Sequence, residues 1–141
     1  MKILIITTGG TIGQEKDENH VSISTEVDYS MDFFESDLIP KDIDFTFENI
    51  YNCDSSNVTP NHWEKIVKCL MQNHDYYDGF IITHGTNTLD YTCAALTFML
   101  EKFNKPVVLT RSSVATCSVT EVMLKQIWQI QFVYFIINIK K

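Results

Sequence analysis

Apolar, mostly β-branched runs alternate with amphipathic stretches over the first 110 residues of the chain. Three runs and one alternating segment predict four strands, at residues 2–7, 44–50, 79–83 and 105–110. Two amphipathic stretches place apolar residues three and four positions apart, which is typical of a helix face. The first face comprises Trp63, Ile66, Val67, Leu70 and Met71, and the second comprises Leu89, Thr92, Leu96, Met99, Leu100 and Phe103.

This alternation favours an α/β fold, in which a parallel sheet, Rossmann-like or flavodoxin-like, carries helices on both faces. The first helix has a clear start, because Thr59 can cap it and Pro60 suits the first helical position, where no N–H is needed. The polar segment 14–30 is interpreted as a surface loop. In sheets of this kind, ligands bind beyond the carboxyl ends of the strands. Three polar turns, at residues 8–13, 54–57 and 83–88, are therefore the candidate site.

The first turn reads TTGGTIG. Gly9 and Gly10 let the backbone approach a ligand, which makes Gly10 a candidate substrate-binding residue. Thr11 presents a hydroxyl that can act as a nucleophile once a base takes its proton, and nearby backbone N–H groups can stabilise an oxyanion. The alternatives are a plain capping turn or a dinucleotide-binding turn, although the glycine spacing does not match that of the dinucleotide motif.

The second and third turns read DSSN and THGTNT. Ser55 and Ser56 offer adjacent hydroxyls suited to a small carboxylate, or alternatively form the lead-in to the following helix. Thr86 and its neighbours either contribute to a site or cap the second helix, and His84 is explained equally well as a strand-end residue bonded to backbone. His20, His62 and His74 are assigned no chemistry.

Charge and cysteine content exclude several classes of function. Eleven basic against eighteen acidic residues give a net charge of −7, which disfavours binding to a nucleic-acid backbone. The four cysteines show no metal-ligand spacing, so we expect no metal, and free thiols suit a reducing cytoplasm. The apolar run near the C-terminus is interrupted by polar residues and is shorter than the roughly 20 residues of a membrane span, so no membrane partner is expected.

The motifs TTGGTIG, DSSNVTP, GFIITHGTNTLDYTCAALTFML and KPVVLT, in this order and spacing, resemble the N-terminal domain of the L-asparaginase family. The resemblance implies hydrolysis of L-asparagine to L-aspartate and ammonia through an acyl-enzyme, without a metal or cofactor. Thr11 then matches the primary nucleophile and Thr86 the second essential threonine, while Ser55 and Ser56 match positions that hold the substrate's α-carboxylate. Members of the family are homo-oligomers.

Three departures from the family pattern matter. Asn87 stands where the family has an aspartate for the substrate's α-ammonium, and a neutral amide should weaken binding and catalysis. The tyrosine of the nucleophile loop has no clean match, Tyr29 being the only nearby candidate. The chain also ends at Lys141, whereas family members continue through a catalytic lysine and a second α/β domain.

Residues 111–141 depart from the family pattern and are interpreted as an aberrant, frameshifted tail behind an incomplete N-terminal domain at residues 1–110. Back-translation of the segment from Thr120, read in a shifted frame with permitted codons, yields the family-like sequence RSDAKTNLANSIC; only the alanine before its second asparagine is forced. The alternative is a genuine short variant whose tail forms a strand or helix.

We therefore expect an asparaginase-type amidohydrolase by descent, with little or no activity of its own. The alternatives are a non-catalytic remnant that binds a small ligand or an intact paralogue, and the amidase subunit of a tRNA-dependent amidotransferase.

Overall fold

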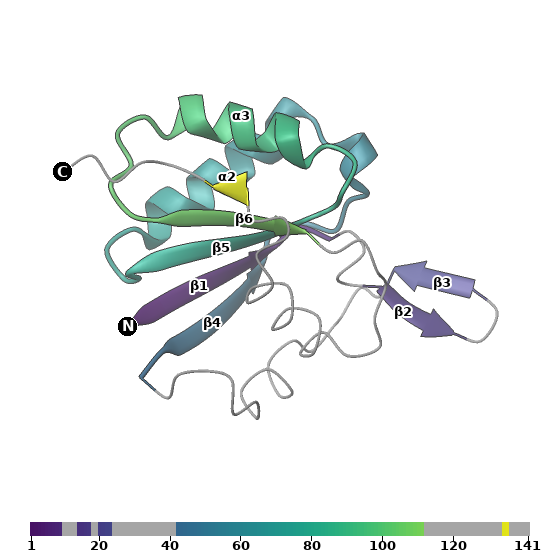
Figure 1. The fold of residues 1–141 in the computed structure, drawn as a ribbon, viewed down its shortest axis with the longest axis horizontal. Helices are drawn as coiled ribbons and strands as arrows, with labels where there is room; N and C mark the ends of the chain where they lie inside the picture. The colour runs from purple at the N-terminus through teal and green to yellow at the C-terminus, as the bar shows by residue number, and fades with distance from the viewer. Residues whose placement is uncertain (10–13, 18–19, 24–41, 112–133, 136–141) are drawn as a thin grey trace.

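The computed structural model describes residues 1–9, 14–17, 20–23, 42–111 and 134–135 of the chain. A five-stranded sheet in the order β4-β1-β5-β6-β7 forms the centre of this part (Figure 1). Its strands are β1 (Lys2–Thr7), β4 (Asp44–Asn49), β5 (Gly79–His84), β6 (Val107–Arg111) and β7 (Tyr134–Phe135). The four long strands correspond to the four that the sequence predicts, within one or two residues at most of their ends.

These four strands run parallel, as expected for an α/β fold. Thr7 of β1 pairs with Asn49 of β4 and with Thr83 of β5, so three strands end at the same level. β7, from the C-terminal segment, instead pairs antiparallel with β6, so the sheet as a whole is mixed.

The polar segment predicted to be a surface loop contains a hairpin, and that prediction is wrong for its first part. β2 (Gln14–Asp17) and β3 (His20–Ile23) pair antiparallel over four residues each, and His20 begins the second strand. Each strand is only four residues long and residues 14–20 are all polar, which explains why the pattern missed the hairpin. Residues 24–30 lie outside the described residues.

Two helices cover one face of the sheet: α2 (Pro60–Asn73) and α3 (Leu89–Met99) (Figure 1). α2 begins as predicted, with Thr59 at the N-cap and Pro60 in its first turn; the Thr59 N–H donates to Nδ1 of His62 at 3.1 Å. A short 3-10 helix, η2 (Ser55–Asn57), precedes α2. Within the described residues, neither helix is both long and apolar enough to cross a membrane.

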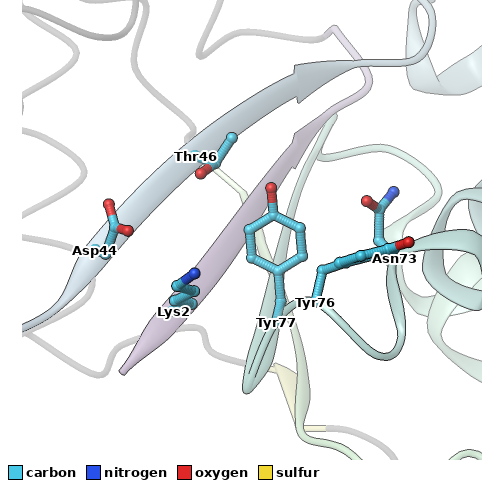
Figure 2. A pocket seen from close by; sticks show the side chains of 6 residues that line it. All are labelled: Lys2, Asp44, Thr46, Asn73, Tyr76 and Tyr77. Atoms are coloured by element: carbon cyan, nitrogen blue, oxygen red, sulfur yellow. The ribbon is translucent and has the colours of Figure 1, made fainter.

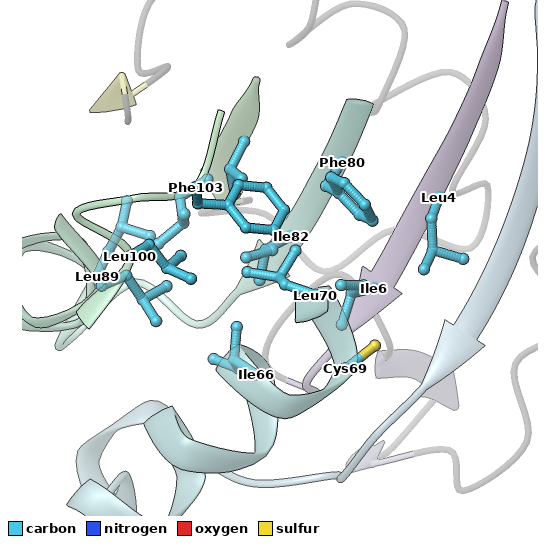
Figure 3. Close-up of a cluster of buried hydrophobic side chains, with 13 residues drawn as sticks. Leu4, Ile6, Ile66, Cys69, Leu70, Phe80, Ile82, Leu89, Leu100 and Phe103 are labelled. Carbon is cyan, nitrogen blue, oxygen red and sulfur yellow. The ribbon is translucent and has the colours of Figure 1, made fainter. Parts of the chain in front are cut away.

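The core lies between these helices and the sheet, and Figure 3 shows strand and helix side chains meeting there. Its members are apolar side chains that are at least 96% buried: Leu4, Ile6, Ile66, Cys69, Leu70, Phe80, Ile82, Leu89, Leu96, Leu100, Phe103, Val107 and Leu109. Ile5, on the opposite face of the sheet, is also fully buried. The sequence predicts helices on both faces of the sheet. In the described part of the chain, both helices lie on the face that carries Leu4.

Two of the predicted helix-face residues point away from the core. Met71 of α2 is 54% exposed and Met99 of α3 is 40% exposed, while Cys69 is buried instead. The buried stripe of α2 runs through Ile66, Cys69 and Leu70, so Met71 falls one residue beyond its edge. Periodicity alone is compatible with burial of either Cys69 or Met71. The position of the sheet relative to α2 determines which of the two is buried.

Candidate active site

Three segments meet where β1, β4 and β5 end. They are Thr8 and Gly9 after β1, the loop from Tyr51 through η2, and the loop between β5 and α3. These segments belong to the three polar turns that the sequence singles out, and the common level of the strand ends brings them together.

Gly9 allows the first turn to pack closely against the second. Its φ of +89° is a left-handed conformation, and a Cβ there would lie 2.7 Å from the backbone nitrogen of Cys53. The Cys53 N–H donates to the Thr8 carbonyl at 3.2 Å across this contact. Gly10 and Thr11, the predicted binding glycine and nucleophile, lie outside the described residues, as does Tyr29.

The second and third loops are joined through Ser55, which is only 3% exposed. Its Oγ accepts from the Asn87 backbone N–H at 3.1 Å, and its carbonyl accepts from the Thr88 hydroxyl at 2.6 Å. Gly85 packs directly on this serine, because a Cβ at Gly85 would lie 2.6 Å from both Cβ and Oγ of Ser55. The two loops therefore form one interlocked unit.

Ser56 and Asn87 extend this unit to the surface. The Asn87 side-chain Nδ2 donates to the Ser56 Oγ at 2.7 Å. The Asp54 carboxylate accepts from the Ser56 backbone N–H at 2.7 Å and also contacts the Ser56 hydroxyl, and these bonds lower the pKa of Asp54. Asp54 is thus a carboxylate at neutral pH.

A buried chain of hydrogen bonds supports the third loop from behind. Nδ1 of His84 bonds the Gly85 carbonyl at 2.8 Å, and since a carbonyl only accepts, Nδ1 carries the proton. Nε2 of His84 then accepts from the Thr92 hydroxyl at 3.0 Å, which itself accepts from Nε1 of Trp63 at 3.0 Å. Burial lowers the pKa of His84, so the ring is neutral. The sequence indicated the backbone bond of His84, whereas Trp63 and Thr92 were expected only as core residues and not as its supports.

Thr86 is half-buried between Gly85 and Asn87, in the loop that joins β5 to α3. Thr88 precedes α3 at its N-cap position, but its side chain makes no capping hydrogen bond, because its hydroxyl donates to the Ser55 carbonyl. The structure thus brings four of the predicted site residues together: Ser55, Ser56, Thr86 and Asn87.

Tyr51 is a further feature, which the sequence did not indicate. Its hydroxyl is enclosed beside Thr8, and within the described part of the chain it has no hydrogen-bond partner of good geometry. Burial raises the pKa of Tyr51 to about 12, partly offset by the nearby Thr8 hydroxyl. The Thr8 hydroxyl donates to the Thr83 carbonyl at 2.7 Å. Only the position of Tyr51, directly after a predicted strand, could have indicated it.

The described residues contain no group of three or more His, Cys, Asp or Glu side chains placed to hold a metal ion. Cys53 and Cys69 are free thiols. Burial raises the pKa of Cys69 to about 12, so it remains a protonated core residue.

Comparison with known proteins adds three findings. The family model described as "Asparaginase, N-terminal" matches residues 2–121. L-asparaginase 1 of Escherichia coli K12 is 39% identical over 114 residues, covering 79% of this chain and 34% of that enzyme. A glutamyl-tRNA(Gln) amidotransferase subunit of Thermoplasma acidophilum is 34% identical over 107 residues, covering 76% of this chain and 26% of that protein.

Among solved structures, L-asparaginase I from Vibrio cholerae O1 biovar eltor superposes with a TM-score of 0.70 at 36% sequence identity. The match covers 88% of this chain and 39% of that one. The chain therefore spans about a third of the length of the relatives that it matches.

Proposed function

The chain belongs to the asparaginase family, and from this premise we propose that it carries the N-terminal half of an L-asparagine amidohydrolase site. The observation that carries the proposal is the interlock of the two loops through Ser55, Gly85 and Asn87 at the carboxyl ends of β4 and β5. It holds hydroxyl and amide groups in fixed positions at the edge where α/β sheets bind ligands.

In the proposed reaction, the Thr11 hydroxyl attacks the side-chain amide carbon of L-asparagine. The C–N bond breaks, ammonia leaves with the transferred proton, and water then hydrolyses the aspartyl ester to release L-aspartate. Thr86 assists attack and proton transfer, and Gly10 contributes backbone contact to the substrate. The proposal invokes no cofactor.

We assign the α-carboxylate of the substrate mainly to Ser55. Its Oγ already accepts from the Asn87 N–H, so its own proton remains available to a carboxylate. The Ser56 hydroxyl is shared with Asn87 and lies against the Asp54 carboxylate, which makes it the weaker donor of the two.

Asn87 limits recognition of the substrate's α-ammonium. Its Oδ1 can accept a hydrogen bond, but the charge-assisted bond of a carboxylate is roughly twice as strong. The neutral amide at this position therefore predicts weak turnover of L-asparagine.

Ammonia release from L-asparagine by the purified chain, beside a Thr11→Ala variant, tests the proposal. We expect little or no release from either protein, together with measurable binding of L-asparagine by calorimetry. Release that disappears in the variant would show that the chain assembles a working site alone. A folded sample that neither binds nor hydrolyses L-asparagine would favour a non-catalytic remnant, and pull-down with an intact paralogue would then test that alternative.

A second candidate function is the amidase subunit of a tRNA-dependent amidotransferase, since the relative at 34% identity is named as a subunit of such an enzyme. The net charge of −7 argues against a tRNA surface. A gel-shift titration with unacylated tRNA decides the matter: saturable binding at physiological salt would favour the amidotransferase.

We further propose that residues 111–141 arise from a shifted reading frame and that the family-like domain is confined to residues 1–110. The shift of frame is placed between about Thr110 and Thr120, and the family model, which extends to residue 121, does not mark this boundary. The coding DNA provides the test, because a shifted frame that does not encode RSDAKTNLANSIC would exclude the frameshift.

The proposed location is the reducing cytoplasm. The free thiols of Cys53 and Cys69 support this proposal. Members of the family are homo-oligomers, and size-exclusion chromatography with light scattering would show whether this chain assembles at all.

A further inference from the structure

A hollow of about 340 Å³ lies at the amino end of the sheet, opposite to the candidate active site. Its lining residues are Lys2, Asp44, Thr46, Asn73, Tyr76 and Tyr77 (Figure 2). β1 separates it from the loops at the carboxyl end by roughly 17 Å, the length of a six-residue strand. A ligand in this hollow would therefore not touch Ser55 or Asn87.

One wall of the hollow presents two opposite charges. Lys2 and Asp44 are direct partners in the register of β1 and β4, so their side chains lie on the same face about one strand spacing apart, roughly 4.8 Å. Neither the Lys2 ammonium nor the Asp44 carboxylate forms an ion pair with another described residue. The protein thus presents a cation and an anion side by side without pairing either of them.

The other wall presents hydrogen-bonding groups. Nδ2 of Asn73 donates to Oε2 of Glu48 and to the Cys69 carbonyl, both at 3.1 Å, so both amide protons are used and Oδ1 is left to accept. The Lys105 ammonium donates to the Tyr77 carbonyl at 2.7 Å and holds the backbone of this wall. Figure 2 shows Asn73, Tyr76 and Tyr77 on the side facing Lys2 and Asp44.

We propose that this hollow binds a free α-amino acid as its zwitterion. The carboxylate of the ligand lies against Lys2 and its ammonium against Asp44, and a polar side chain extends toward Asn73, Thr46 and Tyr77. A phosphorylated ligand would need an excess of positive charge, and an apolar ligand would bury both charges unpaired. This proposal does not depend on the proposed hydrolase function, because it uses the opposite edge of the sheet.

A ¹H–¹⁵N NMR titration of the full chain with L-glutamine tests the proposal. We expect saturable shifts at the amides of residues 2–4, 44–46 and 73–77. N-acetyl-L-glutamine lacks the ammonium and L-glutamine α-amide lacks the carboxylate, so each should bind about tenfold more weakly or worse.

Variants Lys2→Gln and Asp44→Asn should each weaken L-glutamine binding to a similar extent. Both side chains are exposed, so the fold should persist, and well-dispersed spectra check this directly. Lys68→Gln, on the exposed surface of α2, is the matched control and should bind like the parent chain. Shifts confined to residues 54–57 and 83–88, affinity unchanged in both variants, or no response at all would overturn the proposal.

Discussion

The two edges of the sheet differ in whether their polar side chains bond to one another. At the carboxyl edge, Ser55, Asn87 and Thr88 satisfy one another across loops that are far apart in the sequence. At the amino edge, Lys2 and Asp44 lie side by side in register without pairing. The loops at the carboxyl edge are therefore held in place by hydrogen bonds that form without a ligand. The Lys2 and Asp44 charges at the amino edge, in contrast, remain available to a ligand.

The largest effect should follow from Gly9→Ala at the carboxyl edge. An alanine would adopt an unfavourable positive φ and place its Cβ 2.7 Å from the Cys53 backbone nitrogen, which should cost about 3 kcal/mol or more of stability. Gly79→Ala is the control at the amino edge, where the nearest atoms to a Cβ would be side-chain atoms of Ile3 and Pro106, both at 3.2 Å. Urea unfolding should show less than about 1 kcal/mol lost in the control. Equal losses would contradict the contrast between the edges.

Gly85→Ala should separate the interlocked loops at a cost of about 2 kcal/mol, because its Cβ would lie 2.6 Å from the Ser55 side chain. The double variant Gly85→Ala, Ser55→Gly removes the clashing atoms, so the two changes should be strongly non-additive in a double-mutant cycle. Simple additivity would mean that Gly85 and Ser55 do not press on each other in solution.

Thr92→Val should remove the centre of the buried chain behind the third loop. Nε1 of Trp63 and Nε2 of His84 would both lose their partner, at a cost of about 2 kcal/mol. Thr97→Val is the matched control, since the exposed Thr97 hydroxyl bonds only the Cys93 carbonyl of its own helix. Tryptophan fluorescence and urea unfolding measure both effects. An equal loss of stability in the two variants would contradict the role of this hydrogen-bond chain in supporting the third loop.

Asn87→Asp should strengthen L-asparagine binding by about fivefold, since a charge-assisted bond to the α-ammonium replaces a neutral one. The substitution also removes the Nδ2 donor, so the Ser56 hydroxyl must donate to the new carboxylate instead. Calorimetry compares the affinities, with Asn104→Asp outside the loops as the control. Weaker binding in Asn87→Asp would show that the bond to Ser56 matters more than the charge.

The smallest expected effect is a pH dependence of stability, which arises from His74 near the amino edge of the sheet. His74 bonds Asp75 at 2.8 Å and Asn104 at 2.7 Å, and these acceptors raise its pKa. The protonated ring is therefore stabilised on folding, so this contribution is complete below the ordinary histidine pKa and is lost as pH rises through the raised value.

Urea midpoints of the parent chain and of His74→Gln, measured between about pH 5.5 and 8.5, should converge as pH rises. Buried His84 has a lowered pKa and contributes with the opposite sign, but it is common to both proteins and cancels in their difference. A difference that grows with pH would contradict the assignment.

Much of the fold could be predicted from local pattern, because β-branched runs such as residues 2–7 and the Thr59–Pro60 start are decided within a few neighbouring residues. The burial of Cys69 in place of Met71 could not, since it depends on where the sheet lies relative to α2. The hairpin of β2 and β3 was missed because β2 is entirely polar and β3 offers only Val21 and Ile23 as apolar residues, too few to establish an alternation.

The candidate site was predictable as a set of turns but not as a set of bonds. Ser55 and Asn87 were both identified, yet the bond between them joins residues 32 positions apart and needs the parallel register of β1, β4 and β5. The same register creates the pair Lys2 and Asp44, which no local motif indicates.

The central claim is that the interlocked loops form an L-asparagine half-site. Titration of the ¹⁵N-labelled chain with L-asparagine, followed by NMR beside Ser55→Ala, tests it most directly. We expect saturable shifts at Ser55, Ser56, Thr86 and Asn87, with binding that weakens by about tenfold in Ser55→Ala. Shifts that avoid these residues, or that persist unchanged without the Ser55 hydroxyl, would contradict it.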